Sequence, residues 1–317
     1  MITVVRAGPL TTVQDRGRPG YAHLGVPHSG ALDPPAARLA NALAGNDESA
    51  AVLETTLMGC GLRFTVPARV AVTGAVAEVR VDGAVVPPGV QGAGAGLGGG
   101  SYVAAVIEVP VGAVLDVGRA AGGVRSYVAV AGGIDVPPVL GSRSTDTLSG
   151  LGPGRLRDGM TLPVGVVRLG ERSRSAYAYA PAPGPESAAG PFARAAAGGG
   201  VLELDVLPGP RDDWVADRQV LFGDSYQISP VSNRIGARLA GPALTRARPG
   251  ELPPEGIVLG AIQVPPDGQP LIFLADHPTT GGYPVIGVVD DVTPLAQARP
   301  GTTVRFRELH RPQRGSG

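Results

Sequence analysis

The chain has 317 residues and contains no lysine, so that all 27 of its basic residues are arginine. A Walker A site needs a lysine on the phosphates of its nucleotide, and Schiff-base chemistry, including that of pyridoxal phosphate, needs an amine. Covalent biotin and lipoate need a carrier lysine, and the Ser-Ser-Lys machinery of amidase-signature enzymes needs one as well. We therefore expect no covalent biotin on this chain. Any ATP that it helps to consume must be bound by another kind of site or by another protein.

Cysteine, net charge and long apolar runs are also scarce. A lone Cys60 excludes an intrachain disulfide and an all-cysteine metal site, and we interpret it as a small packing residue. The formal net charge is zero and the arginines are spread along the chain, so nothing indicates a nucleic-acid partner. No segment resembles a signal peptide, and no uninterrupted apolar run approaches the roughly 20 residues of a membrane-spanning helix. The sequence thus predicts a cytoplasmic protein without a membrane partner.

Glycine and proline, in contrast, are abundant, at 49 and 32 residues. They are scattered among valine-rich runs, a pattern typical of a turn-rich β protein with little helix. The Pro-, Ala- and Gly-rich segment 176–200 is typical of a linker, and the alternating residues 201–207 resemble the first strand of a new domain. We predict an N-terminal β-barrel domain over 1–175 and a C-terminal β domain over 201–317. The glycine-rich segment 89–100 lacks the context of a phosphate-binding loop, which favours a flexible hairpin loop.

Residues 10–33 combine polar side chains with glycine and proline, a composition that forms ordered loops rather than helix or strand interiors. A helix is predicted directly afterwards, at 34–44, because Asp33 can cap its N-terminus, Pro34 and Pro35 suit its first turn and Gly45 suits its end. For Asp33 we favour this capping role over catalysis. The loop itself offers further candidate site residues, namely Gln14, Asp15, Arg18, Tyr21 and Ser29.

A second polar run lies near the C-terminus, at 260–284. The apolar residues 271–275 predict a short buried strand that ends at Asp276 and His277. Residues 265–268 predict a tight turn before it, since proline presets φ and glycine accepts positive φ. The Thr-Thr-Gly-Gly sequence at 279–282 could be a simple turn or part of a site. The candidate site residues of this run are Gln263, Asp276, His277, Thr279, Thr280 and Tyr283.

A third run, at 226–239, contains Ser229, Ser232, Arg234 and Arg238. The two arginines are four residues apart and would share one face if this segment were helical. Guanidinium groups bind carboxylates and stabilise enolate or imidate oxygens, so both arginines are candidates for holding an anionic oxygen of a substrate. An intramolecular salt bridge is the alternative for both arginines, and the two interpretations stay open.

Metal binding and serine catalysis have less support. The four histidines, at positions 23, 28, 277 and 310, do not have the spacing of metal ligands, and we predict no metal site. Ser29, His277 and Asp276 could form a Ser-His-Asp arrangement, but the sequence has no nucleophile elbow and no oxyanion motif. The sequence therefore does not support a Ser-His-Asp catalytic site.

Six segments in the same order resemble the biotin-dependent carboxyltransferase-like family, and together they span nearly the whole chain. The family includes the C-type subunit of bacterial 5-oxoprolinase (KipA-like proteins), proteins called allophanate hydrolase subunit 2 and a domain of urea carboxylase. The resemblance implies a mainly β protein, with two barrel-like domains related to the cyclophilin fold and few short helices. The matching segments are 8–33, 39–57, 207–210, 229–239, 260–284 and 295–306.

The resemblance implies a component of an ATP-dependent 5-oxoprolinase complex, which opens 5-oxo-L-proline to L-glutamate with ATP and water. The implied partners are a B-type subunit similar to allophanate hydrolase subunit 1, a LamB/YcsF-like protein as the A-type subunit, and a small-molecule substrate. Two alternatives stay open: a biotin-dependent carboxyltransferase of the allophanate hydrolase subunit 2 type that acts on a urea-like substrate, and a non-catalytic protein that antagonises a kinase inhibitor. Asn233, Pro254 and Val285 depart from the family pattern.

We predict that the loop 14–33, the strand end 276–283 and the residues of the third run line one cleft, because each segment is too polar to be core. The predicted catalytic residues are Asp15, Arg18, Arg234 and Asp276. The predicted substrate-binding residues are Gln14, Tyr21, Ser29, Ser229, Ser232, Arg238, Gln263, His277, Thr279, Thr280 and Tyr283.

Overall fold

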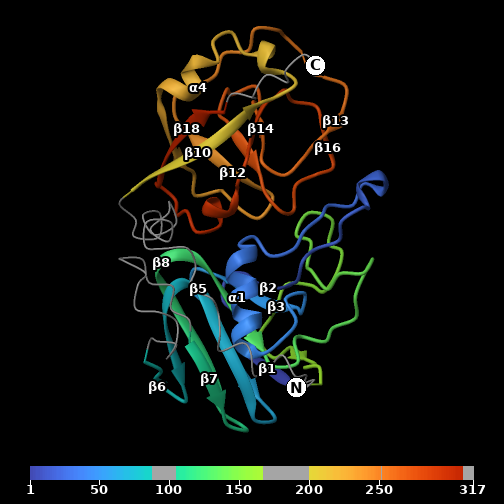
Figure 1. The fold of residues 1–317 in the computed structure, drawn as a ribbon, viewed down its shortest axis with the longest axis vertical. Helices are drawn as coiled ribbons and strands as arrows, with labels where there is room; N and C mark the ends of the chain where they lie inside the picture. The colour runs from blue at the N-terminus through green and yellow to red at the C-terminus, as the bar shows by residue number, and fades with distance from the viewer. Residues whose placement is uncertain (88–104, 167–199, 251, 310–317) are drawn as a thin grey trace, which may run out of the picture.

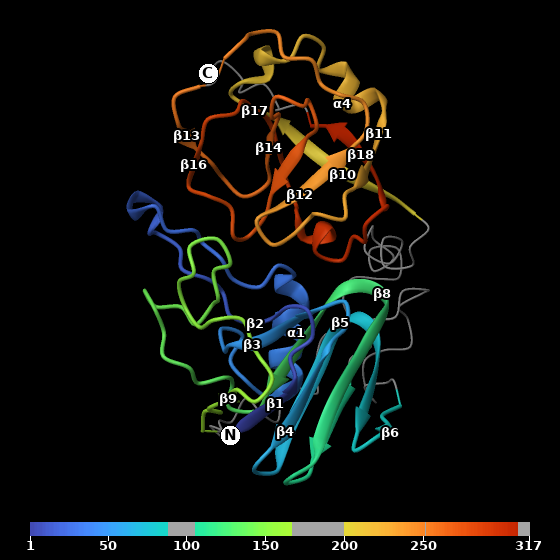
Figure 2. The ribbon, with the colours of Figure 1, turned by 180° about the vertical axis from the view of Figure 1, so that it is seen from behind.

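The computed structural model describes residues 1–87, 105–166, 200–250 and 252–309. Two β structures make up most of these residues, and Figures 1 and 2 show them one above the other. We call them the N-terminal sheet, formed by strands between residues 2 and 162, and the C-terminal barrel, formed by strands between residues 201 and 308. The prediction of a mainly β protein with few short helices is confirmed.

The N-terminal sheet has nine strands and curls around one apolar core. Its two longest strands, β5 and β8, pair antiparallel from Val70 opposite Val130 to Val81 opposite Leu115, and their register shifts at three places. Such bulges bend a strand and increase its twist, which lets the sheet curl. The strands are β1 (Ile2–Arg6), β2 (Thr11–Gln14), β3 (Val52–Thr56), β4 (Cys60–Phe64), β5 (Ala68–Val81), β6 (Ala84–Val85), β7 (Ala105–Val109), β8 (Val114–Val130) and β9 (Thr161–Leu162).

Helix α1 (Pro34–Ala44) confirms the predicted helix and its caps. The Asp33 Oδ1 accepts a hydrogen bond of 3.0 Å from the Ala36 backbone N–H, and Gly45 ends the helix at φ 80°. The buried face of α1 is made of small residues, so the helix lies close to the sheet. It packs against Val52, Ala71, Tyr127 and Ala129. This places the loop before Asp33 at the end of the sheet that faces the barrel (Figure 1).

The C-terminal barrel is closed by seven strands in the order β10-β17-β14-β15-β12-β11-β18. Closure joins β10 to β18 in parallel, with Val201 opposite Thr303, and the alternating burial of β10 confirms the strand that was predicted at 201–207. The strands are β10 (Val201–Pro208), β11 (Ser225–Ile228), β12 (Gly236–Ala240), β14 (Ala261–Gln263), β15 (Leu271–Phe273), β17 (Val285–Val289) and β18 (Thr303–Glu308).

Short elements complete the described part of the chain. The pair β13 (Glu255–Gly256) and β16 (Thr280–Gly281) forms a separate two-stranded sheet beside the barrel. The remaining elements are α4 (Gln219–Gly223) and the single-turn helices η1 (Ala22–Leu24), η3 (Asp212–Trp214) and η4 (Thr293–Ala296). Among the described residues, no helix is long and apolar enough to cross a membrane.

Other local predictions have mixed outcomes. The turn predicted at 265–268 is confirmed, since the Gly268 N–H donates to the Pro265 carbonyl between the paired strands β14 and β15. Cys60 is fully buried in the apolar core, as a packing residue should be. Residues 236–240 form a strand, so Arg234 and Arg238 do not lie on one helical face. The predicted linker 176–200, apart from Gly200, and the predicted hairpin loop 89–100 lie outside the described residues.

Candidate functional site

A cleft of about 850 Å³ lies between the N-terminal sheet and the C-terminal barrel. The sheet side contributes the loop before α1 together with the exposed face of that helix. The barrel side contributes residues 257–259, residues around the end of β15 and residues 289–293. Charged groups of both signs line it: Asp15, Arg16, Arg18, Arg38, Glu48, Asp290 and Asp291.

The cleft brings together about half of the predicted site residues. The N-terminal loop and the residues that follow β15 meet there, since both segments line it; the strand predicted at 271–275 ends at Phe273. The predicted residues that line the cleft are Gln14, Asp15, Arg18, Tyr21, Ser29, His277 and Thr279. Within the described residues, the lining does not include Ser229, Ser232, Arg234, Arg238, Gln263, Asp276, Thr280 or Tyr283.

Arg234 and Asp276 belong to a buried ionic cluster that joins the barrel to the N-terminal part of the chain. The Arg234 Nε and Nη2 donate to the two carboxylate oxygens of Asp276, each at 2.9 Å, and the Nη1 donates to Glu54 Oε1 at 2.6 Å. The side chains of all three residues are at most 1% exposed. The salt-bridge interpretation of Arg234 is thereby confirmed.

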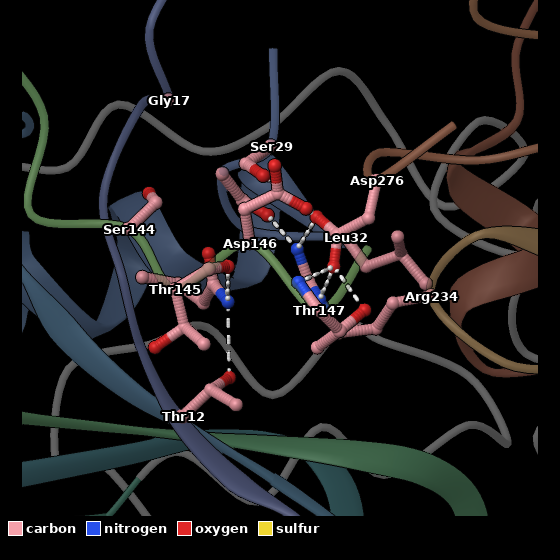
Figure 3. A network of polar contacts seen from close by, with 12 residues as sticks. Thr12, Gly17, Ser29, Leu32, Ser144, Thr145, Asp146, Thr147, Arg234 and Asp276 are labelled. Carbon is pink, nitrogen blue, oxygen red and sulfur yellow. Dashed lines mark hydrogen bonds and ion pairs between the residues drawn. The ribbon is translucent and has the colours of Figure 1, made fainter. Parts of the chain in front are cut away.

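Asp276 also binds the N-terminal sheet directly. It accepts hydrogen bonds from Ser29 Oγ at 2.9 Å, from Thr147 Oγ1 at 2.6 Å and from the Thr147 N–H at 3.0 Å (Figure 3). Burial opposes the charge of the carboxylate, but Arg234 outweighs it and lowers the pKa of Asp276. Burial likewise opposes the charge of Arg234, whose pKa is nonetheless raised by Glu54 and Asp276. Both groups are therefore ionised at neutral pH.

A second buried polar network lies beside this cluster. The Gln297 Nε2 donates to Asp33 Oδ2 at 2.9 Å and to the Arg125 carbonyl at 3.0 Å, so η4 of the barrel is tied to α1 and β8. The Tyr127 hydroxyl donates to Glu54 at 2.9 Å and accepts from the Asp33 N–H at 2.8 Å. Burial raises the pKa of Asp33 and the pKa of Tyr127. Asp33 therefore has two roles, helix cap and junction residue.

Asp15 organises the cleft loop. Its carboxylate accepts hydrogen bonds from the hydroxyls of Ser142 and Ser144, both at 2.6 Å, and from the backbone N–H groups of Gly17 and Arg143 at 2.8 and 2.6 Å. With four donors on two oxygens, Asp15 holds the loop against residues 142–144. Arg18 follows on that loop, and its backbone N–H donates to the His28 carbonyl at 2.7 Å.

His277 borders the cleft from the barrel side. Its Nδ1 donates to the Pro278 carbonyl at 2.7 Å, which fixes the ring, and Phe273 packs beside it. Burial lowers the pKa of His277 and the nearby His28 lowers it further, and together they outweigh the hydrogen bond to Pro278 and the charge of Asp276, which raise it. His277 is therefore neutral at pH 7. Ser29 donates to Asp276 itself rather than to this ring, so the three residues do not form a Ser-His-Asp relay.

The lowered pKa of His277 predicts a dependence of stability on pH. The pKa in the folded chain lies below the unperturbed 6.5, so the unfolded chain binds more protons and the stabilisation is lost as pH falls below 6.5. We expect the free energy of unfolding to fall less between about pH 8 and pH 5 in His277→Asn than in the unmodified chain. Asparagine preserves a donor to Pro278 and does not titrate. Equal pH dependence in the two chains, measured by urea unfolding, would contradict the assignment.

The other predicted residues stabilise loops of the barrel. The Ser229 N–H donates to the Arg238 carbonyl, the Ser232 hydroxyl donates to the same carbonyl and accepts from the Arg238 N–H, and the Arg238 side chain is exposed. The Gln263 Nε2 donates to the Tyr283 carbonyl at 3.0 Å, and the Arg246 guanidinium lies 5.9 Å from the centre of the Tyr283 ring. Thr280 belongs to β16. Across the described ranges, no group of three or more His, Cys, Asp or Glu side chains could hold a metal ion.

Comparison with known proteins identifies the class. Residues 24–308 match the family "Carboxyltransferase domain, subdomain A and B", and the chain belongs to this family. It is 38% identical over 313 residues to the C-type subunit of 5-oxoprolinase from Escherichia coli K12, a match that covers 96% of this chain and 90% of that protein. The chain is therefore homologous to one component of a hydrolase complex.

The family also includes parts of larger enzymes. The chain is 31% identical over 326 residues to urea amidolyase of Saccharomyces cerevisiae, covering 97% of this chain and 16% of that protein. The crystal structure of the K. lactis urea amidolyase matches with a TM-score of 0.79 and 31% identity, over 98% of this chain and 19% of that one. Both matches cover the sheet and the barrel together, so the whole two-part unit recurs inside these enzymes.

Proposed function

We propose that this chain is the C-type subunit of an ATP-dependent 5-oxoprolinase, which converts 5-oxo-L-proline, ATP and water into L-glutamate. The observation that carries the proposal is the similarity to the C-type subunit from Escherichia coli, which extends over nearly the full length of both chains. The cleft supports it, because a largely apolar concave space with a few charged and polar groups is a typical place for a small substrate. The proposed compartment is the cytoplasm, where ATP is supplied.

The proposed assembly includes a B-type subunit similar to allophanate hydrolase subunit 1, and a LamB/YcsF-like protein as the A-type subunit. The residues of this chain do not fit a Walker-type ATP site, because the lysine that such a site places on the phosphates is missing from the whole sequence. ATP is therefore bound elsewhere in the complex or by another type of site. The role that we assign to this chain is to bind and orient the small substrate.

Reconstitution tests the proposal. At micromolar concentration we expect the chain to co-elute with its B-type partner, and ATP-dependent release of glutamate from 5-oxo-L-proline to require this chain together with the B-type and A-type subunits. The purified chain alone should neither hydrolyse ATP nor become biotinylated. Each of the three proteins is omitted in turn as the control. Separate elution of this chain and its B-type partner, or full turnover without this chain, would refute the proposal.

The similarity to urea amidolyase favours a second candidate, a carboxyltransferase that acts on a urea-like substrate. Without lysine this chain would need a biotinylated carrier from another protein. The two candidates are separated by substrate and cofactor: the carboxyltransferase reaction stops when avidin sequesters the biotin carrier, whereas the 5-oxoprolinase reaction continues.

A further inference from the structure

Two buried polar atoms at the cleft have no hydrogen-bond partner within the described residues. They are Nη1 of Arg18 and Oε1 of Gln14, and both residues line the cleft. Arg18 is 1% exposed and Gln14 is fully buried. A buried polar atom without a partner loses the hydrogen bonds that it made with water, and this is unfavourable, more so for a charged group. One donor and one acceptor are thus left for a ligand.

Arg18 is unusual among the buried arginines because no carboxylate pairs with it. Arg125 and Arg234 have Glu54, and Arg16 on the same loop has Glu48 at 2.9 Å, but no ion pair of the described residues involves Arg18. Its Nε and Nη2 donate to the carbonyls of Val139 and Ser144, which leaves Nη1 unused. An uncompensated buried cation attracts an anionic or strongly polar oxygen.

The orientation of the Gln14 amide follows from its neighbours. Its Nε2 donates to the Thr145 carbonyl and to Thr12 Oγ1, both at 3.0 Å. A carbonyl can only accept, so the amide nitrogen must face Thr145, and Oε1 is the unused acceptor. Arg18 and Gln14 are thus anchored on the carbonyls of two consecutive residues, Ser144 and Thr145, and both side chains line the cleft.

We propose that Arg18 and Gln14 together recognise a cis-amide edge, in which a carbonyl oxygen and an N–H lie next to each other on one side of a small planar group. Nη1 of Arg18 donates to the carbonyl oxygen, and Oε1 of Gln14 accepts from the N–H. Lactams and ureido groups both have this edge. The inference rests on the proposed function and deepens it, since it names the part of the substrate that Arg18 and Gln14 bind.

This arrangement gives specificity as well as binding. A ligand that lacks the N–H leaves Oε1 of Gln14 without a hydrogen bond, and a ligand that lacks the carbonyl leaves Nη1 of Arg18 without one. Each such ligand therefore binds more weakly, because a polar group stays buried without a partner. A fixed guanidinium at the carbonyl oxygen also stabilises negative charge that develops on that oxygen.

A ligand series on the full chain tests the edge without any substitution. The probes are 2-pyrrolidinone, which has the edge, N-methyl-2-pyrrolidinone, which lacks the N–H, and cyclopentanone, which lacks the nitrogen. Ligand-observed NMR titration should show that 2-pyrrolidinone binds at least about tenfold more tightly than either analogue. Equal binding of the three probes, or no binding of 2-pyrrolidinone to the chain and to the reconstituted complex, overturns the proposal.

Substitutions then assign the two contacts. In Gln14→Met we expect 2-pyrrolidinone and its N-methyl analogue to bind equally, and in Arg18→Met we expect binding of 2-pyrrolidinone to fall at least about tenfold. Arg80→Met is the matched control, because this arginine is exposed, pairs with Glu78 and does not line the cleft, and the preference for the N–H lactam should persist. Circular dichroism checks folding. A Gln14→Met chain that folds and still prefers the N–H lactam overturns the assignment.

The binding experiments test the recognition of the cis-amide edge separately from the reaction that the complex performs. Selective binding of 2-pyrrolidinone, without turnover of 5-oxo-L-proline by the reconstituted complex, supports the edge and rejects the proposed function. Turnover of 5-oxo-L-proline by a chain that does not distinguish the lactam from its N-methyl analogue rejects the edge and supports the function.

Discussion

Replacement of Arg234 by methionine is expected to lower the free energy of unfolding by about 3–5 kcal/mol. The reason is that Glu54 and Asp276, both at most 1% exposed, would be left buried without their shared cation. Asp276 would also hold Ser29 and Thr147 less firmly, so the barrel and the sheet would separate more easily. We therefore propose that Arg234 holds the two β structures together and does not contact the substrate.

Urea unfolding monitored by circular dichroism measures the change. Arg238→Met is the matched control, because Arg238 lies on the neighbouring strand β12 with an exposed side chain, and its loss should change the free energy of unfolding by about 0.5 kcal/mol or less. A folded Arg234→Met chain with unchanged stability and no turnover would instead favour the catalytic role that the sequence predicted.

The second large effect is expected from Gly17→Ala. Gly17 has φ 80°, and a Cβ atom there would lie 2.4 Å from the His28 carbonyl oxygen and 2.8 Å from that of Ser29. Alanine would meet backbone on both sides, in a conformation that already costs about 1–2 kcal/mol for a residue with a side chain. We expect a loss of about 3 kcal/mol or more in the free energy of unfolding, and loss of complex-dependent turnover because the Arg18 loop shifts.

Gly25→Ala provides the comparison for this loop. Gly25 also has positive φ, at 73°, but no atom lies within 4 Å of the position that its Cβ would occupy. The substitution should therefore cost only the backbone term of about 1–2 kcal/mol. If Gly17→Ala and Gly25→Ala had the same effect in thermal unfolding and in turnover assays, the close contact between residues 17 and 28 would contribute nothing to stability or to turnover.

Local features of the fold could be predicted from the sequence because their causes are local. The caps of α1 depend on Asp33 and Gly45, which lie next to the helix, and the turn before β15 depends on the chemistry of four consecutive residues. The polar composition of the loop before Asp33 was also sufficient to predict that it lines a cleft. These predictions needed no knowledge of distant contacts.

The junction between the sheet and the barrel could not be predicted in the same way. Glu54 lies in the middle of β3, where it looks like the exposed residue of an alternating strand, and nothing near it in sequence shows that Arg234 is its partner. Residues 142–147, which anchor Asp15, Arg18 and Asp276, contain no recognisable motif. Ser229 and Arg238 looked like neighbours of Arg234 in the site, but Ser229 lies in the loop after β11 and Arg238 on β12, and neither residue lines the cleft.

The closure of the barrel has a consequence for synthesis of the protein. Among the described strands, β10 pairs only with β17 and β18, and the parallel partner of Val201 lies about 100 residues later in the chain. On the ribosome, both edges of β10 therefore stay unpaired until β17 and β18 have emerged. Pairing between strands that are far apart in sequence is slow. During that interval Leu32, which fills the barrel core, has no pocket to enter. The nascent chain is thus most exposed to misfolding after β10 has emerged and before β17 and β18 have been synthesised, when chaperone binding to 201–208 should matter most.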